Sequence, residues 1–98
     1  MVWTISPHPS ATEEAREAHL WYLARSPAAA ATFMAELDAA VATIAEAPER
    51  WPELPNGRRR YVMRRFPFVL VFRIHTDHVR LLAVQHGRRK PGYWKDRE

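Results

Sequence analysis

The apolar residues of this chain change their spacing once, between Pro48 and Arg58, and this change restricts the fold more than any other feature. Before it, residues 27–48 carry apolar side chains at intervals of three and four, which is the spacing of an amphipathic helix. That stripe consists of Ala30, Phe33, Leu37, Val41 and Ile44. After it, apolar residues alternate with polar ones, as in a strand with one buried face. The sequence therefore predicts helices in the first half of the chain and strands in the second.

A strand and a further helix are predicted at the start of the chain. Residues 2–5 are rich in β-branched and aromatic side chains, and Pro7 ends this opening strand. Ser10 is the expected N-cap of the helix, and Glu13 is its capping-box partner. The helix runs to about Arg25.

The buried face of this first helix is predicted to hold mostly small residues, which allow a close approach to another element. It consists of Ala11, Ala15, Ala18 and Tyr22. Leu20 and Leu23 are expected to widen the buried arc, and Glu14 is expected to place negative charge in the first turn. Because Ser26-Pro27 caps the next helix almost at once, the two helices should form an antiparallel hairpin.

Three strands are predicted in the second half, as an antiparallel meander over residues 58–86. Phe66-Pro67 makes a corner, residues 68–74 form the central strand, and residues 75–78 form the turn into the last strand. The core face of the central strand carries Phe68, Leu70, Phe72 and Ile74. The predicted fold is α+β with the order β-α-α-β-β-β, in one domain over residues 1–98. Its helical hairpin packs on one face of a mainly antiparallel sheet.

The composition restricts the surroundings in which this fold is expected to work. The chain has 98 residues and no cysteine, so it has neither disulfides nor a thiolate zinc site. No signal-peptide pattern follows Met1, and no apolar run approaches the roughly 20 residues that span a bilayer. These features predict a cytoplasmic protein with no membrane segment and no cofactor.

Charge divides the chain into two unlike halves. Residues 1–57 carry three arginines and eight carboxylates, a net charge of −5, whereas residues 58–98 carry twelve basic residues and three carboxylates, a net charge of +9. Clustered cations attract phosphates and acidic protein segments, so the second half is expected to face an anionic partner. A basic surface that is merely solvated is the alternative.

The stretch from Val84 to Trp94 carries the residues best suited to binding or chemistry. It follows an apolar strand, and Gly87 and Pro91-Gly92 break regular structure, so its polar groups are displayed where a strand ends. The polar and aromatic groups of this stretch include His86, Arg88, Arg89, Lys90, Tyr93 and Trp94.

Several short pieces of sequence, together with the predicted element order, point to a known family. They are Tyr22-Leu23 before Ser26-Pro27, Ala47-Pro48-Glu49, Arg65-Phe66-Pro67-Phe68, and Val84-Gln85-His86-Gly87-Arg88-Arg89 with Tyr93-Trp94. In this order and spacing, over nearly the whole chain, they resemble the ParE/RelE superfamily of type II toxin-antitoxin toxins, also called plasmid stabilisation proteins. The resemblance implies a toxin that is neutralised by an acidic antitoxin in a hetero-oligomer.

This superfamily contains two activities. RelE-like members cleave mRNA on the ribosome, whereas ParE-like members bind DNA gyrase and block replication. Cleavage of RNA through the 2′-hydroxyl needs a base, an acid and a cation. If the chain is an RNase, the resemblance implies that His86, Tyr93 and Arg88 supply them.

The RNase pattern is incomplete in this chain. The resemblance would place an arginine early in the central strand and lysines near the preceding loop, but Val69 and Val71 occupy the strand positions and residues 49–57 contain no lysine. This departure favours ParE-like binding of gyrase over catalysis. A ribosome-dependent mRNA endoribonuclease is the first alternative, and a non-toxic basic module that binds nucleic acid is the second.

The residues expected to contact the target or the antitoxin are mostly cationic. They are Arg64, Arg65, Arg88, Arg89, Lys90 and Trp94. Three of the candidates also have structural interpretations, in which His86 hydrogen-bonds the backbone at a strand end, and Tyr93 and Trp94 pack as a lid on the sheet. His75 and His78 flank a turn that holds Asp77, which is too few fixed ligands for a metal site.

Overall fold

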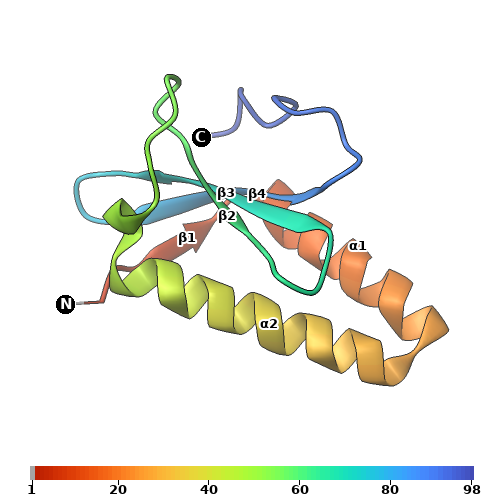
Figure 1. Ribbon diagram of the computed structural model, residues 1–98. Coiled ribbons are helices and arrows are strands. Elements are labelled where there is room, and N and C mark those ends of the chain that lie inside the picture. The colour runs from red at the N-terminus through yellow and green to blue at the C-terminus, as the bar shows by residue number, and fades with distance from the viewer. Residues whose placement is uncertain (1) are drawn as a thin grey trace.

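The computed structural model describes residues 2–98 and has the element order that the sequence predicts. The elements are β1 (Ile5–Pro7), α1 (Pro9–Arg25), α2 (Pro27–Glu46), a 3-10 turn (Pro48–Arg50), β2 (Arg59–Val62), β3 (Phe68–Ile74) and β4 (Val79–His86). In Figure 1 the two helices lie on one side of the sheet, and the loop before β2 and the C-terminal segment lie on the other. The predicted fold class is therefore confirmed.

The sheet has the strand order β1-β4-β3-β2. Strand β1 pairs in parallel with β4, and the three later strands pair antiparallel as the predicted meander. This order brings the N-terminal strand, and the helix that follows it directly, beside the last strand.

The first strand begins and ends later than predicted. It covers Ile5–Pro7 rather than residues 2–5, so Pro7 belongs to the strand instead of ending it. A proline is tolerated here because β1 lies at the edge of the sheet, where one side of the backbone needs no ladder partner.

The predicted cap of α1 is also wrong. Pro9 occupies the first helical turn, so the helix begins before Ser10, and His8 is the N-cap. The Nδ1 atom of His8 accepts the N–H of Ser10 at 3.0 Å. Glu13 makes a bidentate pair with Arg16 on the helix surface rather than a capping box.

Helix α2 has the predicted bounds. The Ser26 hydroxyl accepts the N–H of Ala29 at 3.1 Å, and the helix ends at Glu46, two residues before Pro48. By length and composition α2 is apolar enough to cross a bilayer, which the sequence analysis does not anticipate. In the structure one face of α2 lies in the domain core. A core helix can have the same length and apolar composition as a helix that crosses a bilayer.

The main core lies between the helices and the sheet. Its largest buried side chains are Phe33, Leu37, Ile44, Phe68, Leu70 and Phe72. The predicted face of β3 is therefore confirmed, with Ile74 partly buried at its end. The prediction for Leu20 and Leu23 is wrong, because their side chains are 45% and 43% exposed. They lie off the Ala11–Ala18 stripe, on the side of α1 that faces away from the sheet.

A second, smaller cluster lies on the opposite face of the sheet. It contains Val71, Leu82, Ala83 and Trp94, with Val69 and Tyr93 packed against it. The register shifts between Val71 and Phe72, which pair with Ala83 and Leu81 and leave Leu82 as an extra residue. This irregularity allows the consecutive residues Leu82 and Ala83 both to join the cluster.

Candidate functional site

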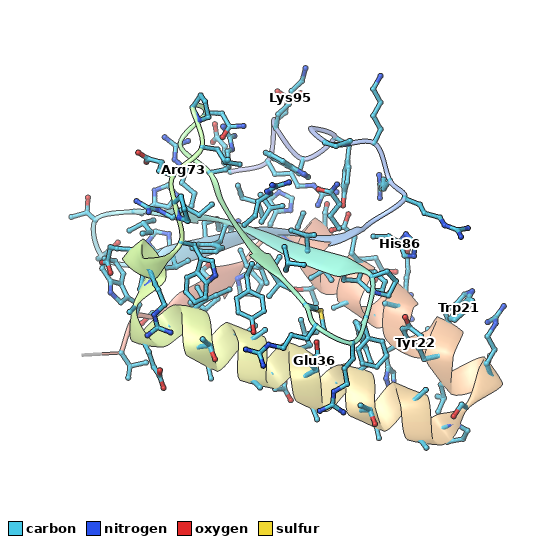
Figure 2. All side chains as sticks on the ribbon, viewed as in Figure 1. Trp21, Tyr22, Glu36, Arg73, His86 and Lys95 are labelled. Carbon is cyan, nitrogen blue, oxygen red and sulfur yellow. The ribbon has the colours of Figure 1, made fainter. Side chains whose placement is uncertain are left out.

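An open groove of about 610 Å³ lies between α1, the start of β3, the end of β4 and the C-terminal segment, residues 87–98. Its apolar lining includes Ala18 and Tyr22 from α1, Phe68 from β3 and Val84 from β4. The small Ala18 side chain leaves space beside the larger aromatic rings. In Figure 2 the labelled His86, Trp21 and Tyr22 lie at the same end of the molecule, where this groove opens.

The corner between β4 and the C-terminal segment is closely packed. The Gly87 N–H donates to the Pro67 carbonyl at 2.6 Å, and a Cβ atom on Gly87 would lie 3.4 Å from that same oxygen. That separation is an ordinary van der Waals contact, so the hydrogen bond rather than the missing side chain is the specific feature of this corner. The bond holds the end of β4 against Pro67, where the basic residues leave the sheet.

His86 makes the backbone contact that the sequence allows. Its Nδ1 atom accepts the N–H of Arg88 at 3.0 Å, and its ring meets Phe68 edge-on with 5.1 Å between ring centroids. Since Nδ1 accepts a hydrogen bond, the proton of the neutral ring is on Nε2. In this arrangement the Nδ1 lone pair is engaged in a hydrogen bond, and the Nε2–H group is left as a donor.

Tyr93 lies against two guanidinium groups at the other wall of the groove. The guanidinium carbon of Arg89 lies 3.5 Å from the ring centroid and that of Arg97 lies 5.0 Å from it. The hydroxyl is buried without a hydrogen-bond partner among residues 2–98. Burial, with the nearby Glu14 carboxylate, raises the pKa of Tyr93 to about 12. The phenol is therefore held in its protonated form and is poorly matched to proton transfer near neutral pH.

Glu14 connects α1, β4 and the C-terminal segment, a role that the sequence analysis does not predict. Its carboxylate accepts the N–H of Val84 at 2.9 Å and makes two contacts of 3.0 Å with Arg97. Arg89 lies 3.4 Å away. Because α1 begins at Pro9, Glu14 lies beyond the first turn, so the predicted first-turn charge is also corrected.

Trp94 lies inside the protein rather than on the binding surface predicted for it. The side chain is 4% exposed, and its Nε1–H donates to the Oε1 atom of the buried Gln85 at 2.7 Å. The alternative interpretation, a packing lid on the sheet, is confirmed. Trp94 is buried because the C-terminal segment packs it against the second apolar cluster, beside Val71 and Leu82.

The predicted cationic contacts fall in different places. Arg88 and Arg89 line the groove, and Lys90 follows them at an exposed position. Arg64 and Arg65 are exposed at the β2–β3 corner beside α2, where both backbone N–H groups donate to Glu36. The structure therefore brings only part of the predicted set to the groove.

The groove also includes an aromatic residue that the sequence analysis does not single out. Trp21 is 53% exposed and lines the groove, and the Arg25 guanidinium stacks on its ring at 3.7 Å. Its place off the stripe of Ala11, Ala15, Ala18 and Tyr22, in the last turns of the predicted helix, is the signal that could have identified it. Leu20 and Leu23 are also exposed near the end of α1, but they do not line the groove.

The histidines of the β3–β4 turn are stacked on each other. Their rings are nearly parallel, with 4.7 Å between centroids, and the Nδ1 atom of His78 lies 2.8 Å from an Asp77 oxygen. Within residues 2–98 no group of three or more His, Cys, Asp or Glu side chains is placed to hold a metal ion.

Comparison with known proteins identifies the family. The model of the "ParE toxin of type II toxin-antitoxin system, parDE" matches residues 5–91, which is most of the chain. The chain belongs to the ParE toxin family. Its fold is similar to that of a solved structure described as the chromosomal ParDE TA system from P. aeruginosa, with a TM-score of 0.75 and 17% sequence identity. The match covers 87% of this chain and 96% of the other. No curated protein sequence matches it.

The face of the sheet opposite the helices bears on which of the two activities of the superfamily the chain could have. Val69 and Val71, the positions where the RNase pattern would place an arginine, point to this face and belong to the second cluster. Trp94 and Tyr93 lie against them. At these two strand positions the valine side chains and the covering indole offer no donor to a phosphate. The groove instead combines apolar, aromatic and cationic groups.

Proposed function

We propose that this chain is the toxin of a type II toxin-antitoxin pair, acts in the cytoplasm by binding DNA gyrase, and is neutralised by an acidic antitoxin. The observation that carries the choice of target is the apolar cover over Val69 and Val71. A phosphate-cleaving site needs fixed donors for the developing negative charge, and losing one such donor typically costs about 10²- to 10³-fold in rate. His86 and Tyr93 are also poorly suited to the proton transfers of such a site, because the Nδ1 atom of His86 accepts the Arg88 N–H and the raised pKa of Tyr93 is poorly matched to neutral pH.

The groove is the proposed docking site of the antitoxin. Its apolar lining is bordered by Trp21 on one side and by Arg88 and Arg89 on the other. Acidic segments that fold on binding cover such surfaces with an apolar face and pair their carboxylates with the surrounding cations. The +9 charge of residues 58–98 supports an acidic partner.

The test compares the two activities directly. We expect the purified protein to inhibit supercoiling by purified gyrase and to leave ribosome-bound mRNA intact in a translating system. Arg88→Glu should weaken the inhibition of gyrase because it places a negative charge where an anionic partner docks. The exposed Arg16→Glu on α1, outside the groove, is the matched charge reversal and should have little effect.

One observation supports the enzyme as the second candidate. His86, Arg88 and Tyr93 all line the same groove, so the three groups that the RNase needs are close to one another. Specific cleavage of ribosome-bound mRNA that is lost in His86→Ala or Tyr93→Phe would establish this candidate and overturn the gyrase proposal.

A further inference from the structure

The edge of β4 beyond β1 is closed by an ion pair instead of a strand. Strand β1 pairs with β4 only as far as Pro7, which lies opposite Leu81. Past that point the Val84 N–H donates to Glu14 at 2.9 Å, and the Leu82 carbonyl accepts from Arg97 at 3.0 Å. Glu14 and Arg97 are joined by two contacts of 3.0 Å, so their paired side chains satisfy the backbone groups that a neighbouring strand would otherwise satisfy.

The Glu14 carboxylate contacts two cations of the C-terminal segment. Arg89 and Arg97 lie 3.5 and 5.0 Å from the centroid of the Tyr93 ring, and both reach Glu14. The side chains of Glu14 and Arg97 are only 11% and 16% exposed. Removing the negative charge would leave a shielded guanidinium without a carboxylate, beside a second guanidinium. A buried charge that loses its partner is strongly unfavourable, so the segment would have to move.

Other contacts, such as two at residues 94 and 95, hold the segment from the side of the sheet that faces away from the helices. Trp94 donates to Gln85, and the Arg58 guanidinium donates to the Lys95 carbonyl at 2.7 Å. Each contact joins residues 94–95 to the face of the sheet opposite the helices, whereas Glu14 is the contact from α1. Glu14 is therefore the point at which the helix that lines the groove meets the segment that carries the groove's cations.

We propose that Glu14 is a positioning residue, which acts through Arg97 and Arg89 to hold residues 87–98 so that Arg88 and Arg89 face the groove in one arrangement. Glu14 need not touch the partner for this role. Its effect on binding rests on the proposed function, but its effect on the segment does not.

The test uses Glu14→Gln, which keeps the shape of the side chain and an oxygen for the Val84 N–H but loses the charge. We expect the backbone amides of residues 93–97 to exchange with solvent at least about 10-fold faster, while the amides of α2 keep their protection. Half-maximal inhibition of gyrase should need about 10-fold more protein, a typical coupling between two sites. The control is Glu13→Gln, the same change on the neighbouring residue, whose only ion pair within residues 2–98 is with the exposed Arg16.

A double-mutant cycle separates positioning from a general loss of stability. Arg97→Gln should reproduce the effect of Glu14→Gln, and the double variant should show little further loss because the two residues act as one unit. Unchanged exchange of residues 93–97 in Glu14→Gln, or additive effects in the cycle, would overturn the proposal. If the wild-type protein does not inhibit gyrase, the proposed function fails, and the exchange measurement still decides the role of Glu14.

Discussion

Single side chains in the groove have contacts that restrict their chemistry. His86 and Tyr93 are the two residues that an RNase would use for proton transfer. One accepts a backbone N–H through Nδ1, and the other is a buried phenol between arginines. Both residues therefore contribute to the shape of the groove, and its cations are the groups best suited to bind an anion.

The titration of Tyr93 provides a test of this arrangement. Its pKa is raised from 10.0 to about 12, chiefly by burial. Below pH 10 the phenol is protonated in both the folded and the unfolded chain. Between about pH 10 and 12 only the unfolded chain loses the proton, so the free energy of unfolding should fall as pH rises through this range. A difference titration of phenolate absorbance between the wild type and Tyr93→Phe should show the high-pH group. A group that titrates near pH 10 would contradict the burial.

Helix α2 is the scaffold on which the sheet packs. The same leucine-to-alanine change, made once in α2 and once at an exposed position of α1, tests this. Leu37 is 6% exposed in the core, so Leu37→Ala should lower the free energy of unfolding by about 2–5 kcal/mol through the cavity that it leaves. Leu20 is 45% exposed on α1, and Leu20→Ala should change it by no more than about 0.5 kcal/mol. Urea denaturation of both variants is the measurement. Equal losses would show that the two leucines are buried alike.

The C-terminal segment is both part of the core and the carrier of the groove's cations. Truncation after Gly87 would therefore remove two functions at once, because it would also uncover Val71 and Leu82. A loss of toxicity in the truncated chain would then not be separable from a loss of stability. Single substitutions within the segment are sharper.

Trp94, which is buried, and Trp21, which is exposed, give such a test. Trp94→Ala should lower the free energy of unfolding by about 3–5 kcal/mol, because it opens the second cluster and leaves the Gln85 side chain without its partner. Trp21→Ala should change stability by no more than about 1 kcal/mol, chiefly the stacking of Arg25, and should instead weaken antitoxin binding. Thermal unfolding and co-purification with the antitoxin distinguish the two. A stable Trp94→Ala variant would show that the indole is not a structural lid.

How well each element could be predicted depended on whether local sequence determined it. Helix α2 and strand β3 have strong periodicity, and their bounds and faces were predictable. The start of α1 was not, because Ser10 is a residue type that commonly caps helices, whereas His8 is an unusual cap. Pro9 is compatible with the first helical turn and allows the earlier start. Leu20 and Leu23 were misplaced because short apolar spacing does not reveal which side of a helix meets the sheet.

The site was predictable only in part, for a similar reason. The cations after His86 were visible as a run in the sequence. The role of Glu14 was not, because it depends on contacts with Val84 and Arg97, which lie 70 and 83 residues away in the chain. Trp94 has a buried environment that only the packing of the segment over the β4 irregularity creates.

In the whole molecule, charge is segregated between the two layers. Helix α2 carries Glu36, Asp38 and Glu46 and no basic residue, whereas the strands and the C-terminal segment carry most of the cations. Thirteen of the fifteen basic residues are arginine. Arginine forms planar, bidentate contacts with carboxylates. An arginine-rich surface is therefore better suited to recognise an acidic segment than a surface of equal charge without such contacts.

This segregation predicts how association with the antitoxin should respond to salt. Charges that steer encounter are screened over about 8 Å at physiological ionic strength, while apolar contacts in the groove are not screened. Raising the salt from about 50 to 500 mM should therefore lower the association rate constant at least about 10-fold and change the dissociation rate constant less. Stopped-flow mixing of the purified toxin with its antitoxin measures both constants. Arg88→Glu should flatten the salt dependence, whereas Arg16→Glu, on the acidic layer and outside the groove, should leave it nearly unchanged. An association rate that does not vary with salt would mean that the +9 half does not face the antitoxin.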